Sequence, residues 1–84
     1  MEKIYLIESE AVFDCELIRG FRAAHKSLLK ARLQYEDELN LIKSKYKEDD
    51  WEEDETDTCY EAFESGYAVQ NHVCVTITEL ILND

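Results

Sequence analysis

The sequence lacks the short motifs by which many enzymes are recognised. It contains no glycine-rich phosphate loop, no G-x-S-x-G turn around a serine nucleophile and no H-E-x-x-H zinc site. Eight of its twenty carboxylates are crowded into one polar run, where the burial that tunes an acid or base for catalysis is not expected. We therefore predict that the chain is not an enzyme and that it uses no cofactor.

The sequence also lacks a long apolar run. No segment approaches the roughly 20 apolar residues that cross a bilayer. The apolar residues at the start are few and are followed at once by Glu8 and Glu10, a pattern that differs from a signal peptide. We expect a soluble, cytoplasmic protein with no membrane partner.

Cysteine is scarce and is not paired in sequence. Cys15, Cys59 and Cys74 are odd in number, lie far apart and form no C-x-x-C motif. A zinc site needs about four closely spaced Cys or His ligands, and the only close pair is His72 with Cys74. We interpret the three cysteines as reduced thiols and predict no metal site.

Basic residues are absent from the second part of the chain. All nine Lys and Arg residues fall within residues 1–47, where eight acids leave a sum of +1. Residues 48–84 contain twelve acids and no base, and the whole chain of 84 residues has a net charge of −11. A hydrophobic fraction of 45% still favours one folded domain over residues 1–84 rather than disorder. The uneven charge is an argument about partners and not about the fold.

The first half of the chain predicts a hairpin followed by a long helix. Residues 3–9 and 12–21 are rich in β-forming residues and predict two strands that turn at Glu10 and Ala11. Apolar residues then recur in steps of three and four, and neither Gly nor Pro interrupts residues 23–46. This pattern predicts a helix over about residues 23–46.

The second half predicts a short helix and two more strands. Thr58 and Glu61 match a capping box, and Gly66 is placed to end a helix over residues 59–65. Residues 67–70 and 73–82 predict the last two strands. The order ββα(α)ββ indicates an α+β domain, with one long helix packed on a mostly antiparallel four-stranded sheet and an acidic loop at about 47–57.

Two leucines fall outside the predicted apolar stripe of the long helix. On a helical wheel Leu29 and Leu33 share an outward sector with Arg22, Lys26 and Glu36. Exposed leucines are common on protein surfaces. The alternative is a small dimer patch, because a second apolar strip allows a helix to pack against another copy of itself.

The order of these segments, together with their sequences, resembles that of a group of known proteins. A hairpin ending in "ELIRGF", a helix opening with "HKSLLKA", an acidic insertion and a closing strand "VTITELIL" together resemble small uncharacterised bacteriophage proteins. In size, acidity and compactness the chain is also similar to phage anti-CRISPR proteins and DNA mimics. This resemblance implies a protein that inhibits a bacterial defence complex inside the host cell, and it assigns no individual residue a function.

The run "KEDDWEEDETD" at residues 47–57 has three interpretations. It is a solvated linker, a calcium loop or a surface that imitates nucleic-acid phosphates. For calcium, Asp50, Glu52 and Asp54 fall at positions 1, 3 and 5 of an EF-hand loop, but Glu55 stands where that loop requires glycine. For mimicry, side chains two apart on an extended segment lie about 6.6 Å from each other, a spacing close to that of successive phosphates.

The mimicry interpretation defines the candidate partner-binding residues. They comprise the acids of this run, two acids beyond it and the single tryptophan: Glu48, Asp49, Asp50, Trp51, Glu52, Glu53, Asp54, Glu55, Asp57, Glu61 and Glu64. Trp51 either pins a linker to the domain or anchors the chain in a partner's pocket.

We predict an anti-CRISPR-like inhibitor that covers the basic nucleic-acid-binding site of a CRISPR-type effector or similar protein. Direct binding of nucleic acid is not expected at this net charge. The alternative is a structural or assembly protein that self-associates through Leu29 and Leu33.

Overall fold

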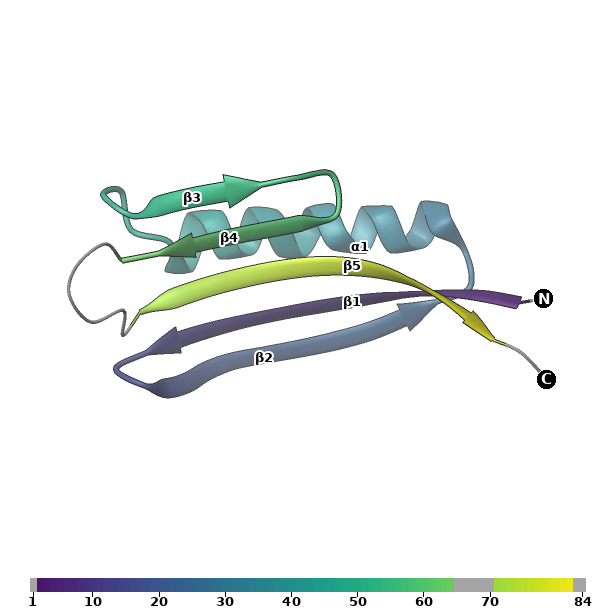
Figure 1. Ribbon diagram of the computed structural model, residues 1–84, viewed down its shortest axis with the longest axis horizontal. Helices are drawn as coiled ribbons and strands as arrows, with labels where there is room; N and C mark the ends of the chain where they lie inside the picture. The colour runs from purple at the N-terminus through teal and green to yellow at the C-terminus, as the bar shows by residue number, and fades with distance from the viewer. Residues whose placement is uncertain (1, 65–70, 83–84) are drawn as a thin grey trace.

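The computed structural model describes residues 2–64 and 71–82, which form one helix packed on a five-stranded sheet (Figure 1). Along the chain the elements are β1 (Glu2–Phe13), β2 (Glu16–His25), α1 (Leu28–Leu41), the π-helical turn η1 (Ile42–Tyr46), β3 (Glu52–Glu55), β4 (Cys59–Phe63) and β5 (His72–Leu82). The predicted α+β class is confirmed. The predicted number of four strands is wrong, because the described residues form five.

The first and last strands lie side by side in the middle of the sheet. The order is β2-β1-β5-β4-β3, and each strand is antiparallel to its neighbours. β1 pairs with β5 from Glu2 opposite Leu82 to Val12 opposite His72. This arrangement leaves β2 and β3 as the two edges of the sheet.

The first hairpin turns at Asp14 and Cys15, and the prediction of a turn at Glu10 and Ala11 is wrong. The φ angles of Asp14 and Cys15 are 53° and 64°, the left-handed values that a tight two-residue hairpin loop requires. The Asp14 N–H donates to the side-chain oxygen of Asn71 (2.9 Å), which ties the turn to the start of β5. The turn was missed because it contains no glycine.

The helix begins later than residue 23. Residues 23–25 finish β2 instead, where Ala23 lies opposite Ile7 and His25 lies opposite Tyr5. The Ser27 hydroxyl then caps α1 by accepting the N–H of Lys30 (3.3 Å). Pairing with β1 satisfies the backbone of residues 23–25, so it overrides the helix preference of alanine.

The predicted helix at 59–65 is wrong, because Cys59–Phe63 form strand β4. Tyr60 and Ala62 are fully buried while Glu61 between them is exposed, which is the period of a strand. The predicted acidic loop contains strand β3, so it is not a loop throughout. The predicted strand at 67–70 lies outside the described residues, and the strand at 73–82 is confirmed within β5.

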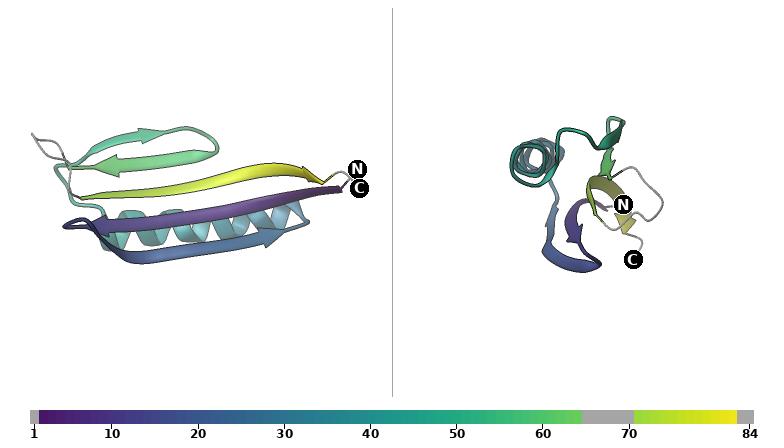
Figure 2. Two further views of the ribbon diagram at one scale, coloured as in Figure 1. Left: turned by 60° about the horizontal axis from the view of Figure 1, so that its bottom comes forward. Right: turned by 90° about the vertical axis from the view of Figure 1, so that its left-hand side faces the viewer.

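The helix α1 lies against one face of the sheet (Figure 2), and the hydrophobic core lies between them. Ala31, Tyr35 and Leu39 of α1, with Ile42 of η1, pack on the sheet. The sheet contributes Ile7, Ala11, Tyr60, Ala62, Val73, Val75 and Ile77. Among the described elements, none packs on the other face of the sheet. No helix in residues 2–64 and 71–82 has the length and apolar content to cross a bilayer.

One carboxylate is buried under the helix. Glu38 of α1 is 5% exposed and accepts a hydrogen bond from the Ser9 hydroxyl of β1 (2.5 Å). Arg19 of β2 donates to the same carboxylate through Nε (3.2 Å) and Nη2. The ion pair therefore connects the helix to the centre of the sheet and to its β2 edge.

We predict that Arg19→Met destabilises the fold by about 2–3 kcal/mol, because it leaves a buried carboxylate without its cation. We expect a smaller loss of stability than for a fully buried ion pair because the Arg19 side chain is 27% exposed. Urea denaturation followed by circular dichroism measures the change. The double variant Arg19→Met/Glu38→Met should recover most of the loss, and a double variant as unstable as the single one would contradict this account.

Candidate functional site

Strand β3 divides the acidic run between the two faces of the sheet. Its register places Glu53 opposite Ala62 and Glu55 opposite Tyr60, both of which face α1. Glu52 and Asp54 therefore point to the other side, because successive side chains of a strand alternate. The eight carboxylates of residues 48–57 do not form one continuous surface.

The carboxylates on the helix side are paired. Glu53 lies 2.8 Å from Lys47 Nζ and accepts the Tyr60 hydroxyl at 2.7 Å. Both contacts lower the pKa of Glu53 below its ordinary value, and the contact with Lys47 has the larger effect. Glu55 lies 2.6 Å from Lys43 Nζ. Both carboxylates hold the edge strand to the end of the helical segment.

The carboxylates on the other side continue across the sheet. Asp54 lies opposite Glu61, Glu61 opposite Cys74, and Cys74 opposite Glu10. This row crosses β3, β4, β5 and β1, and Glu8 lies two residues before Glu10 on the same face. We call this side of the sheet the open face, and its six strand carboxylates are Glu2, Glu8, Glu10, Glu52, Asp54 and Glu61.

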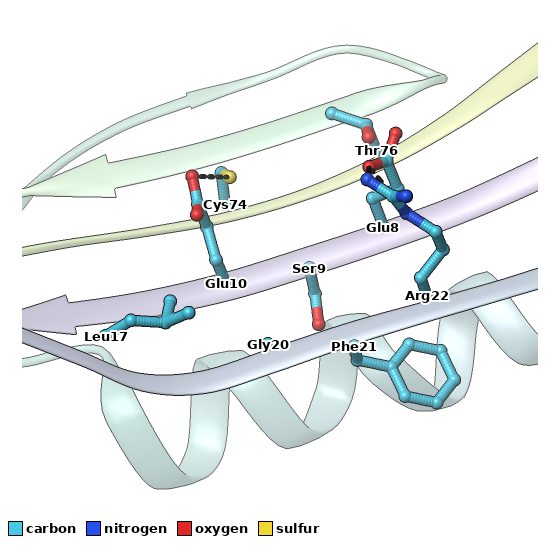
Figure 3. Close-up of a pocket in the computed structure, with 9 residues that line it drawn as sticks. All are labelled: Glu8, Ser9, Glu10, Leu17, Gly20, Phe21, Arg22, Cys74 and Thr76. Carbon is cyan, nitrogen blue, oxygen red and sulfur yellow. Dashed lines mark hydrogen bonds and ion pairs between the residues drawn. The ribbon is translucent and has the colours of Figure 1, made fainter.

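The charges are segregated by the sheet. Two cations pair with acids of the open face: Arg22 contacts Glu8 at 2.8 Å (Figure 3), and Lys26 lies 3.9 Å from Glu2 at the start of β1. Lys43, Lys47 and Arg19 instead contact acids on the helix side. Within the described residues, Glu10, Glu52, Asp54 and Glu61 form no ion pair. The open face therefore carries the excess negative charge of the sheet.

Two thiols lie among these carboxylates. Cys74 Sγ is 3.7 Å from Glu10, and Cys59 Sγ is 3.9 Å from Glu61. Burial, and then the charge of Glu10, raises the pKa of Cys74 to about 11. Burial and Glu61 also raise the pKa of Cys59. Because the thiolate is the nucleophile, neither thiol is activated for attack.

The open face is hollowed beside these groups. One hollow of about 570 Å³ is lined by Glu8, Ser9, Glu10, Leu17, Gly20, Phe21, Arg22, Cys74 and Thr76. A second, of about 400 Å³, lies between Glu10 and Glu61 and reaches Phe63 and His72. Figure 3 shows Glu10 and Cys74 beside each other, and these two residues line both hollows.

The remaining predicted acids lie apart from the open face or at its margin. Glu48, Asp49, Asp50 and Asp57 are exposed in the segments that flank β3. The Asp57 carbonyl accepts from Arg32 (2.6 Å), while Glu64 accepts from the Asn71 side chain (2.8 Å). Their role in partner binding stays a prediction.

Trp51 is packed onto the domain. It is 8% exposed, and its ring lies 5.6 Å from that of Phe13, centroid to centroid. This contact fixes the start of β3 against the end of β1. The burial favours the interpretation of Trp51 as an internal pin for this segment over that of an anchor in a partner's pocket.

Leu29 and Leu33 lie on the outer side of α1 and are 72% and 60% exposed. No described element of the chain covers them. Their predicted role in self-association is not tested by the fold.

The sequence pattern failed to identify Glu8 and Glu10 as part of the acidic surface. On β1 they alternate with Ile7, Ser9 and Ala11, which are buried toward α1. The two glutamates therefore point to the open face. Glu8 already lies within the predicted strand 3–9, and extending that strand beyond residue 9 would have placed Glu10 on the same outer face. Glu8 and Glu10 are far from the acidic run in sequence, and only the order of the strands brings them onto the same face of the sheet.

Within residues 2–64 and 71–82, no group of three or more His, Cys, Asp or Glu side chains is arranged to hold a metal ion. Glu52 and Asp54 belong to an extended strand, which differs from the tight turn of an EF-hand loop. Comparison with protein-family models, curated proteins and solved structures finds no match to the chain. The resemblance to phage proteins therefore stays a prediction.

We predict that Glu10→Gln increases the rate at which iodoacetamide alkylates Cys74, by about threefold or more at pH 8.5. Removing the neighbouring negative charge lowers the thiol pKa, so that more thiolate is present. Mass spectrometry in a Cys15→Ser/Cys59→Ser background measures the rate. Glu52→Gln is the matched control and should leave it nearly unchanged, while an unchanged rate in Glu10→Gln would contradict the prediction.

Proposed function

We propose that the chain is a non-enzymatic inhibitor, of the phage anti-CRISPR type, that covers a basic nucleic-acid-binding site on a bacterial defence complex. It acts in the cytoplasm of the host cell by presenting carboxylates where the target expects phosphates. The observation that carries the proposal is the segregation of charge, which leaves four carboxylates of the open face without a cation among the described residues.

The arrangement supports a protein partner rather than direct nucleic-acid binding. Glu10, Glu61 and Asp54 lie in one row across four strands, and phosphates would be repelled there. Lysines and arginines of a nucleic-acid-binding groove would be attracted, because complementary charge guides encounter and fixes orientation. A rigid sheet holds such carboxylates in place, whereas a flexible linker would have to order them on binding.

The experiment compares two variants that change the net charge equally. The open-face variant is Glu10→Gln/Glu52→Gln/Asp54→Asn/Glu61→Gln. The control variant is Glu48→Gln/Asp49→Asn/Asp50→Asn/Asp57→Asn. Each removes four negative charges, and neither disturbs the pairs made by Glu53 and Glu55.

We predict that the native chain, expressed in a CRISPR-immune bacterial strain, restores plaque formation by a targeted phage. The open-face variant should restore plaque formation at least tenfold less efficiently than the native chain. The control variant should lose little, because only the carboxylates of the open face contact the partner. Plaque counts measure the effect across strains carrying different CRISPR types. Absence of restoration in all of them, or equal loss in both variants, would contradict the proposal.

A second candidate function is self-association through the outer side of α1. The observation that favours it is the exposure of Leu29 and Leu33, which lie one helical turn apart. An apolar contact of this kind joins two copies without help from charge.

Under this alternative, sedimentation velocity detects a dimer whose stability is insensitive to salt, since apolar contacts are not screened. Leu29→Gln/Leu33→Gln should shift the chain to monomer. Leu17→Gln changes a leucine of similar exposure on the sheet, 57%, and should leave the dimer intact. A native chain that is monomeric at all concentrations would exclude this function.

A further inference from the structure

Of the two hollows described on the open face, the one between Glu10 and Glu61 matches one kind of side chain in shape and charge. Cys74 lies on β5, between Glu10 on β1 and Glu61 on β4. Neighbouring strands are about 4.8 Å apart, so these two glutamates are separated by roughly 10 Å of backbone. The shorter cysteine leaves a depression between two longer acidic side chains.

A glycine leaves the adjoining hollow open beside Glu10. Gly20 lies opposite Glu10 on β2 and lines that hollow. A Cβ built at Gly20 would meet only the end of Leu17, at 3.4 Å, which is an ordinary contact. The backbone could therefore carry a side chain at residue 20, and the gap is not imposed by close packing.

The carboxylates around the hollow have weak partners. Among the described residues, the Glu10 and Glu61 carboxylates accept hydrogen bonds only from thiols, at 3.7 and 3.9 Å. A thiol is a poor donor compared with a guanidinium or an ammonium group. Phe63 adds apolar surface to this hollow, and Leu17 adds it to the adjoining hollow on the other side of Glu10. The methylene groups of a long basic side chain can lie against such surface.

We propose that the open face docks a segment of a protein partner by one arginine side chain, which lies over Cys74 between Glu10 and Glu61. This proposal rests on the proposed function and specifies the group that the inhibitor recognises. The occupant is an arginine because its planar guanidinium can donate to both carboxylates at once, while its stem covers the apolar margin. Glu52 and Asp54 lie nearer the β3 edge and contribute long-range attraction.

The experiment measures binding of a fluorescein-labelled nine-residue oligo-arginine peptide by fluorescence anisotropy at low salt. Glu10→Gln/Glu61→Gln should weaken binding about tenfold or more. Glu52→Gln/Asp54→Asn removes the same charge from the same face and should weaken it only about twofold to threefold. A glycine-serine peptide of equal length is the control for the dye and should not bind.

A third variant tests the hollow without changing charge. Cys74→Phe fills the space between the two glutamates and should weaken binding at least fivefold. Circular dichroism and a melting curve confirm that each variant is folded, and Cys74→Ser, which keeps the hollow open, should bind like the native chain.

The outcomes separate this docking site from the broader function. Equal losses in the two charge variants, or native binding by Cys74→Phe, would overturn the docking site, as would failure of the native chain to bind the peptide. In that case, plaque restoration that still depends on the open-face carboxylates would leave the proposed function standing. If plaque formation is not restored but the peptide still binds selectively in the hollow, the proposed function would be overturned and the docking site would stand.

Discussion

The contact of Glu38 with Arg19 and Ser9 is the constraint on which the rest of the structure depends. It joins α1 to β1 and to the edge strand β2 through a carboxylate that is 5% exposed. A buried charge is tolerated only when it is paired and hydrogen-bonded, so the helix is held where both partners can reach it. The apolar core then fills the space between this contact and the opposite edge.

The same principle determines where the other charges lie. Lys43 and Lys47, at the end of the helical segment, are close enough to neutralise Glu55 and Glu53 on the helix side of β3. These contacts stabilise an acidic edge strand that would otherwise be repelled by its own charge. Because Lys43 and Lys47 pair with acids on the helix side, they do not neutralise the carboxylates of the open face, and the negative charge collects there.

This separation joins stability to the proposed function. The chain has a net charge of −11, and two of its cations, Arg19 and Lys47, lie in partly buried pairs with Glu38 and Glu53. The unpaired carboxylates face solvent, where their repulsion is screened and where a basic partner can reach them. Trp51, buried against Phe13, fixes the position of the edge strand that carries two of these carboxylates.

The sequence by itself determined the α+β class, the helical segment that ends at Tyr46 and the last strand, because each depends on local periodicity. It also determined the absence of bases after Lys47, and hence an acidic half. Tertiary structure decided that Cys59–Phe63 is a strand, that residues 23–25 extend β2 and that the turn lies at Asp14, since partner strands supply hydrogen bonds that override local preference. It also decided the composition of the acidic surface, because only strand order brings Glu10 of β1 beside Glu61 of β4, with Cys74 between them.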